Sequence, residues 1–413
     1  MAKRTGRLCL SPAVWTVVFA LAACLPAAGQ TTPPIQGVST TIPELTAAGT
    51  ITQMVKPVGP PHGGDALVLA TKLAVATSPL ASSSGGFEIK LDPSTGLQVR
   101  TATTFGPSFA ERALTSGEGK VSLGVNFMSS SYDQLGGQTY AGLQVRSVTA
   151  SNPNDSRSGL SNITETASTV AVGGRMGVTD NLDIGFVLPI VTVKVGGSTS
   201  LRNGNGNILT YATGSDAGTG LGDIAAIVKY RFYSFGAVQP DPGGIAVMAS
   251  VRLPTGDTEN LRGLGVTRTL VSLIVSSGQR RFRPHANVGF EAWSKGVTVA
   301  SDYTAGGTVT ARHQLQYAAG LELEAAPKCT VLVDFLGGEI FGGGKLGFQA
   351  DPGSASTSSL VALPEGLSRM QIVPGVKVNL KAKLLLSANA LITLKDDGLH
   401  ARVTPMAGID LTF

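Results

Sequence analysis

The chain has 413 residues, of which 42% are hydrophobic, only 14% are charged and 53 are glycine. This composition is too rich in glycine for a helical protein, so strands and turns are the expected elements. The formal net charge is +5 and no basic run is interleaved with aromatic residues, which gives no reason to expect a nucleic-acid partner.

Residues 1–29 have the pattern of an export signal peptide, which is predicted to be removed. An apolar core over residues 13–23 leads to a small-residue cleavage site at residues 27–29. The basic residues that precede this core are Lys3, Arg4 and Arg7. Residues 21–24 also resemble the bacterial lipoprotein box, so a lipid anchor at Cys24 is a minority alternative. No later apolar run reaches about 18 residues, so a membrane-spanning form of this chain has to be a closed barrel.

Residues 30–116 are predicted to form an N-terminal arm, which could act as a hatch for a barrel. Residues 31–64 are rich in Pro, Thr and Gly and show little periodicity, which indicates a linker or a poorly ordered periplasmic segment. Residues 65–77 fit either a short capped helix or a strand. Residues 86–105 alternate around an Asp-Pro-Ser-Thr-Gly turn at residues 92–96, which predicts a hairpin.

Regular alternation begins at Gly117 and continues to Phe413, and these residues form the predicted barrel domain, 117–413. In the last stretch Ile409, Leu411 and Phe413 share one face of a strand, while Asp410 and Thr412 lie on the other. Comparable segments are long enough for a tilted strand to cross a bilayer. They lie near residues 118–131, 163–178, 182–190, 224–232, 243–255, 267–277, 282–295, 315–323, 328–341, 368–380, 384–394 and 401–413.

The connections between these segments alternate in length. Short turns are predicted at residues 179–181, 278–280, 326–328 and 381–382. Longer loops rich in Gly, Ser, Asn and Asp are predicted at about residues 196–220, 256–266, 296–310 and 345–366. This asymmetry is typical of outer-membrane barrels, which have short periplasmic turns and long outer loops. We therefore predict an all-β, transmembrane antiparallel up-and-down β-barrel of about 12 strands, with 14 as the alternative, in the Gram-negative outer membrane.

Several motifs resemble the outer-membrane transporter family associated with phenol meta-pathway degradation. They are Phe105-Gly-Pro-Ser-Phe-Ala-Glu-Arg-Ala-Leu-Thr115, Gly222-Asp223 followed by Lys229-Tyr-Arg-Phe232, Leu253-Pro-Thr-Gly-Asp257 with Gly263-Leu-Gly265, and Arg283-Pro-His-Ala-Asn-Val-Gly-Phe290. The resemblance covers about residues 80–413. It implies a barrel that admits hydrophobic or aromatic small molecules, as the long-chain fatty-acid channels do. No motif of that family defines substrate contacts, so no binding residue is carried over.

The polar face of the predicted strands carries charges of both signs, which should pair inside a narrow lumen and partly fill it. The candidate lumen-facing residues are Arg175, Asp183, Asp223, Lys229, Arg231, Arg252, His285, Glu291, Glu322, Glu324, Asp334, Lys377, Lys395 and Asp410. No catalytic, cofactor-binding or metal site is predicted, because the four histidines lack ligand spacing and no G-x-S-x-G motif occurs.

The favoured hypothesis is therefore a non-enzymatic channel for passive uptake of small hydrophobic or aromatic compounds. The alternative is a structural or adhesive outer-membrane barrel that acts through its surface loops. The predicted partners are outer-membrane lipid, the solute, and the barrel-assembly machinery, which we expect to recognise the C-terminal Phe413.

Overall fold

The computed structural model describes residues 35–42, 46–81, 89–91, 98–100, 104–235, 243–278, 281–303, 307–351, 354–381, 384–395 and 397–413. The predicted signal peptide and the lipid anchor at Cys24 lie outside these residues, as does the turn predicted at residues 92–96. Among the described helices, none combines the length and the apolar character needed to cross a membrane.

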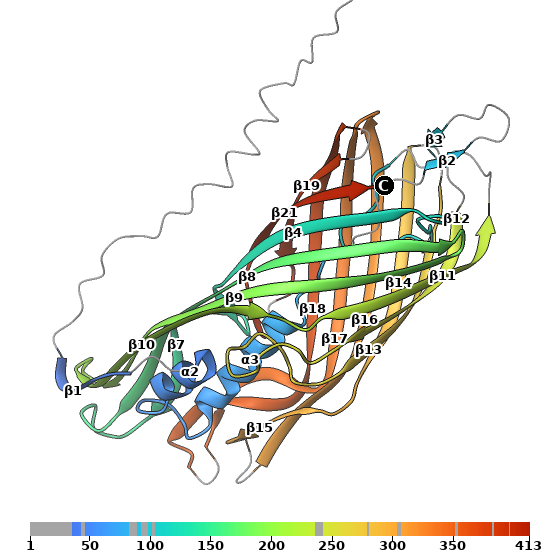
Figure 1. Ribbon diagram of the computed structural model, residues 1–413. Helices are drawn as coiled ribbons and strands as arrows, with labels where there is room; N and C mark the ends of the chain where they lie inside the picture. Colours follow the sequence, from blue (N-terminus) through green and yellow to red (C-terminus); the bar gives the residue numbers. More distant parts are fainter. Residues whose placement is uncertain are drawn as a thin grey trace, which may run out of the picture. The chain divides into compact units, whose positions relative to one another are not determined.

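Twelve antiparallel strands close into a barrel, as the sequence predicts (Figure 1). The ring closes where the last strand pairs with the first and Leu411 lies opposite Leu123, so the wall has no edge in the ring itself. In order around the ring the strands are β4 (Val121–Tyr132), β8 (Arg157–Thr179), β9 (Leu182–Asn203), β11 (Ala225–Phe235), β12 (Gly243–Arg252), β13 (Arg268–Ser276), β14 (Phe282–Trp293), β16 (Gly307–Ala326), β17 (Cys329–Ala350), β18 (Thr357–Lys381), β19 (Leu384–Thr393) and β21 (Val403–Thr412).

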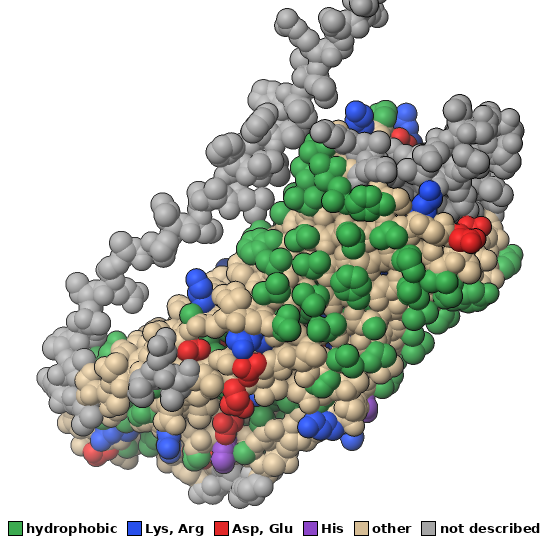
Figure 2. Space-filling model, viewed as in Figure 1, with side chains coloured by type: hydrophobic (Ala, Val, Ile, Leu, Met, Phe, Trp, Pro, Cys, Tyr) green, Lys and Arg blue, Asp and Glu red, His purple; other side chains and the backbone are tan. Residues whose placement is uncertain are grey.

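The outer face of the wall changes from apolar to polar along each long strand. On β8, Met176 and Val178 are exposed apolar side chains, whereas Asn162 and Thr164, on the same face, are exposed polar ones. The apolar part runs from Val170 to Val178, nine residues, which is the length that a tilted strand needs to cross a bilayer. Figure 2 shows the hydrophobic side chains gathered over one part of the wall. We call the apolar part, which carries the C-terminus, the membrane end, and the other part the outer end.

Three of the four predicted long loops are wrong, because their residues extend the strands of the outer end. Residues 196–220 lie mostly in β9 and in β10 (Ile208–Leu221), which pairs with β9 from Ile190 to Arg202. Residues 345–366 belong largely to β17 and β18, and residues 297–301 form β15 (Val297–Ser301), which pairs with β16. Thr and Ser at these positions support strands as well as loops. Only the region 256–266 contains no strand.

Smaller strands complete the outer end. β1 (Ile35–Thr41) pairs parallel with β10, and β7 (Ala141–Val148) pairs with the first residues of β8 and β18. β5 (Gln134–Leu135) pairs with both β6 (Gln138–Thr139) and β20 (Leu399–His400) in a small separate sheet. The predicted hairpin contains β2 (Ile89–Leu91) and β3 (Gln98–Arg100), which pair antiparallel.

Two helices of the arm fill the outer end. They are α2 (Ala47–Val55) and α3 (Gly63–Ala76), and Figure 1 places them at the end opposite the C-terminus. The Thr46 side chain caps α2 by accepting a hydrogen bond from the Gly49 N–H at 3.1 Å. Ile51 and Met54 pack against Val193 and Val195 in the main apolar core. The sequence predicted a linker over residues 31–64, but the many prolines and glycines concealed α2.

Candidate solute pathway

The chain returns from the hairpin into the membrane end of the barrel as residues 104–116, which we call the lumen segment. Its backbone N–H groups are satisfied by side chains of the wall. The Asp334 carboxylate accepts hydrogen bonds from the N–H groups of Ser108 and Phe109, both at 3.1 Å, and Glu322 accepts one from Gly106 at 3.0 Å. Hydrogen bonds to a buried carboxylate are about twice as strong as neutral ones, so these contacts fix the segment in place.

Further along the lumen segment, the wall side chains pair with the backbone as a neighbouring strand would. The Asn287 side chain accepts from the Glu111 N–H at 2.7 Å and donates to the Glu111 carbonyl at 2.9 Å. The Ala113 N–H donates to Ser276 at 3.0 Å, and the Ser116 N–H donates to Asp183 at 3.0 Å. Side chains therefore replace the ladder that the segment would form inside a sheet.

The Glu111 carboxylate of the lumen segment lies in the first of three charge clusters. It forms two parallel hydrogen bonds with Arg175, at 2.8 and 3.0 Å, and an ion pair with Lys229 at 3.4 Å. Lys229 also lies 3.9 Å from Asp183 and donates to the Leu114 carbonyl at 2.6 Å. Three predicted lumen residues thus meet around one carboxylate of the arm, and each buried charge has a partner of opposite sign.

The second cluster also involves the lumen segment. Arg112 of the segment pairs with Glu322 at 3.6 Å, and His285 lies 3.0 Å from Asp334. Lys377 donates to the Pro107 carbonyl at 2.7 Å. These contacts bring together four of the predicted lumen residues and bind them to the same stretch of backbone.

The third cluster contains no residue of the arm. Arg268 pairs with Asp223 at 3.2 Å and with Glu291 at 3.6 Å, and Glu291 also accepts from the Trp293 indole at 2.8 Å. The Asp223 carboxylate further accepts from the Gly256 N–H at 3.1 Å, which attaches the loop after β12 to the wall.

The remaining predicted residues are more scattered. Arg231 donates to Asn181 and to the Asp180 carbonyl in the turn between β8 and β9. Lys395 pairs with Asp397 at 3.3 Å, Asp410 is buried, and Glu324 is partly buried. Arg252 lines the cavity described below.

Sequence reasoning did not select Glu111, Arg112, Arg268 and Arg369, although each of them is part of the lumen. The first two belong to the motif 105–115 but to no periodic strand, so no face could be assigned to them. Arg268 and Arg369 lie on recognised strand segments, and the alternation there could have placed them.

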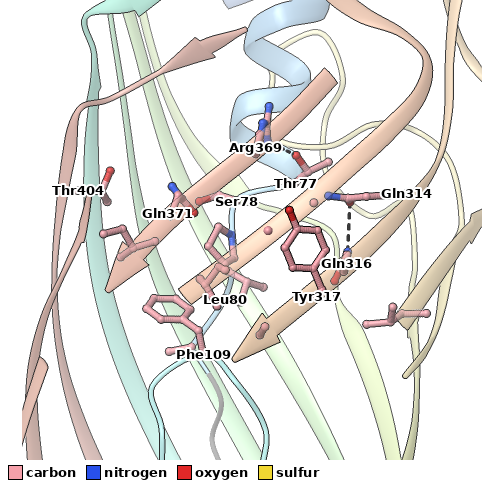
Figure 3. A pocket seen from close by; sticks show the side chains of 18 of the residues that line it. Thr77, Ser78, Leu80, Phe109, Gln314, Gln316, Tyr317, Arg369, Gln371 and Thr404 are labelled. Carbon is pink, nitrogen blue, oxygen red and sulfur yellow. Dashed lines mark hydrogen bonds between the residues drawn. The ribbon is translucent and has the colours of Figure 1, made fainter. Parts of the chain in front are cut away.

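A cavity of about 240 Å³ lies between the two parts of the arm. Ala74, Thr77 and Leu80 of the descending chain line it on one side, and Phe109 and Glu111 of the lumen segment line it on the other. Figure 3 shows Leu80 and Phe109 on the same side of the cavity, with Tyr317, Gln314 and Gln316 across from them. The cavity is therefore a chamber in the bore that the arm lines from two sides.

Helix α3 is attached to the wall by a buried carboxyl, Glu165, which lies five residues beyond Val170 and thus outside the membrane end. Thr71 and Tyr140 both form hydrogen bonds with Glu165, that of Thr71 at 2.6 Å. Burial raises the pKa of Glu165 to about 7, although both hydrogen bonds lower it. The Thr71 hydroxyl has a single proton, yet it lies 3.0 Å from the Leu67 carbonyl as well as close to Glu165. Both hydrogen bonds form at once if Thr71 donates to the carbonyl and a protonated Glu165 donates to Thr71.

No family model matches the chain, and no curated protein matches it. Among solved structures, an outer-membrane channel from Pseudomonas putida F1 is 11% identical with a TM-score of 0.44, over 73% of this chain and 98% of that chain. The monoaromatic hydrocarbon channel CymD is 10% identical with a TM-score of 0.33, over 72% of this chain and 89% of that chain. The toluene transporter TbuX of Ralstonia pickettii is 10% identical with a TM-score of 0.26, over 72% and 90%. All these TM-scores lie below 0.5, so we base the functional proposal on the residues of this chain.

Proposed function

We propose that the protein is an outer-membrane channel for passive uptake of small hydrophobic or aromatic compounds, and that its N-terminal arm closes the bore. The observation that carries this proposal is the chamber of about 240 Å³ in the barrel, which residues of the arm line from both sides. The apolar belt of nine residues on β8 supports insertion in the outer membrane, where such barrels reside. Residues 1–29 serve as the export signal in this proposal.

The arm provides the closure because it is bound by polar contacts and not by a continuous apolar core at the membrane end. The predicted lumen charges hold it in place through Glu111, Arg112 and backbone N–H groups. The bore is thus closed at rest, and release of the lumen segment opens a path from the chamber to the membrane end.

The decisive test weakens the attachment of the lumen segment by changing one carboxylate of the segment and one of the wall. In the double variant Glu111→Gln, Asp334→Asn, two carboxylates that hold the segment lose their charge. We expect a several-fold higher conductance in planar bilayers and faster entry of a labelled single-ring aromatic into cells that produce the variant. Glu118→Gln is the matched control, because Glu118 is an exposed carboxyl directly after the segment.

Each variant is first shown to be folded by its anomalous migration in unheated detergent gels. A folded double variant with unchanged conductance and uptake would reject the channel proposal and favour a structural or adhesive barrel. Recovery of the wild-type protein in the soluble periplasmic fraction would reject the outer-membrane location. Loss of assembly after removal of Phe413 would support its role as the signal for the assembly machinery.

A further inference from the structure

The chamber contains an arginine that no carboxylate neutralises. Arg369 donates to the Leu73 carbonyl at 3.2 Å and to the Thr77 hydroxyl, and Figure 3 shows it next to Thr77 at the chamber. Its Nη2 atom is buried without a hydrogen-bond partner, and no ion pair of Arg369 occurs within the described part of the chain. A buried N–H group of a cation without a counter-charge is costly, so this guanidinium is suited to bind an anion.

A second arginine, Arg252, lines the same chamber. It lies on β12, five strands away from β18 in the ring of twelve, so the two guanidinium groups approach the chamber from different sides. The carboxylates near Arg252 are Asp223 and Glu291, and both are already paired with Arg268. No hydrogen bond or ion pair of Arg252 occurs among the residues that the structure describes.

The other charges that line the chamber nearly balance one another. Glu111 offsets Arg175, and Asp397 offsets Lys395. Arg268 is shared between two carboxylates. Arg268 and Arg252 together carry two positive charges beside the two carboxylates Asp223 and Glu291. Arg369 therefore leaves one positive charge in excess around the chamber, and a carboxylate is the group that best matches the guanidinium fork.

Part of the chamber lining is apolar, and the cavity has the size of one aromatic ring with a substituent. Leu80, Phe109, Leu336 and Leu391 contribute apolar side chains. A cavity of roughly 150 Å³ is enough to hold benzene, so about 240 Å³ leaves room for one further small group. The combination of these apolar side chains and an arginine without a counter-charge is complementary to an amphipathic anion.

We propose that the chamber binds an organic anion made of a carboxylate and a single-ring apolar body. This inference rests on the proposed channel function and specifies its class of solute. The carboxylate contacts Arg369 or Arg252, and the ring lies against the apolar side chains. Neutral rings of the same size enter the chamber but leave the guanidinium groups without a partner.

The test compares benzoate with benzyl alcohol, which has a similar size and no charge. Both are titrated into the full-length protein in detergent, and their permeation is measured in the opened double variant reconstituted in liposomes. We expect benzoate to bind about tenfold more tightly or better, because a hydrogen bond to a charged group is stronger than a neutral one. In Arg369→Gln and Arg252→Gln we expect benzoate to lose about that factor while benzyl alcohol binding stays the same.

Arg402→Gln is the control, because Arg402 is a highly exposed arginine away from the chamber lining. Unchanged benzyl alcohol binding in each variant shows that the chamber itself is intact. Equal binding of the two ligands to the wild type, or unchanged benzoate binding in both chamber variants, would overturn the inference while leaving the channel proposal in place. If neither compound passes through the opened barrel, the channel proposal itself fails.

Discussion

The membrane end and the outer end of the barrel are built from the same strands but have opposite polarity. On β9, Ile184 and Phe186 face outward and Asp183 faces inward, and all lie at the membrane end. Farther along, Lys194 faces outward and Val193 is buried inward. Inward and outward side chains alternate without a break along the strand. Only the polarity of the two faces is reversed between the ends.

The comparison shows that the polarity of each face follows from what that face contacts. At the membrane end the outside meets lipid and the inside holds a polar lumen segment, so apolar side chains face out and charged ones face in. At the outer end the outside meets water and the inside packs on α2 and α3, as in a soluble protein. The point of exchange, near the pair Val170 and Ile190, marks the outer border of the membrane.

The largest loss of stability is expected if a charge is placed inside the outer end. Val193→Asp puts a carboxylate into the core that contains α2, where the native side chain is only 1% exposed. We expect a loss of roughly 3–5 kcal/mol, because the charge has no partner there. Urea unfolding of the reconstituted protein measures this loss. Lys194→Asp, one residue away on the exposed face, should change the stability by less than about 0.5 kcal/mol, and a similar loss in both variants would contradict the assignment of faces.

A smaller effect is expected for a charge on the outside of the membrane end. Phe186→Arg exposes a cation to lipid, at a cost of roughly 2–4 kcal/mol near the middle of the bilayer. The yield of assembled barrel, read from heat-dependent migration in gels, should fall accordingly. Thr166→Arg tests the same outward orientation at the outer end, where water surrounds the barrel. Equal yields for the two variants would show that the border between the two ends is misplaced.

The mildest prediction concerns pH and the attachment of α3 at the outer end. The pKa of Glu165 is about 7 in the folded protein and near 4.5 when unfolded, so the folded state binds more protons between these values. The contribution of Glu165 to stability is therefore fully present below about pH 4.5 and is lost as the pH rises through about 7. The expected loss is of the order of 1–3 kcal/mol.

Amide hydrogen exchange of α3 measures this effect directly. Protection of the helix should be higher at pH 5.5 than at pH 8, and Glu165→Gln should remove most of the difference because its amide stays neutral. Glu118→Gln, an exposed carboxyl at the membrane end, should leave the difference unchanged. Equal protection of α3 in the wild type at both pH values would rule out Glu165 as the titrating group.

The sequence by itself predicted a barrel of about twelve strands, and the structure has twelve. It could do so because lipid outside and a polar lumen inside impose a period of two on every strand at the membrane end, and this pattern is local. The same pattern identified lumen candidates, because a charged residue on the polar face of such a strand is expected to point inward. Examples are Arg175, Lys229, Asp334 and Glu322.

Only the tertiary structure decided what those charges bind and what fills the barrel. Glu111 meets Arg175 across 64 positions of sequence and Asp334 meets Ser108 across 226, distances over which no local pattern extends. In sequence, the strands of the outer end resemble loops. Their inward faces pack against the helices inside the barrel, and a local sequence pattern does not reveal that partner. The lumen segment has no period of its own, since its backbone is satisfied by side chains of many different strands, and that arrangement exists only once the barrel has closed.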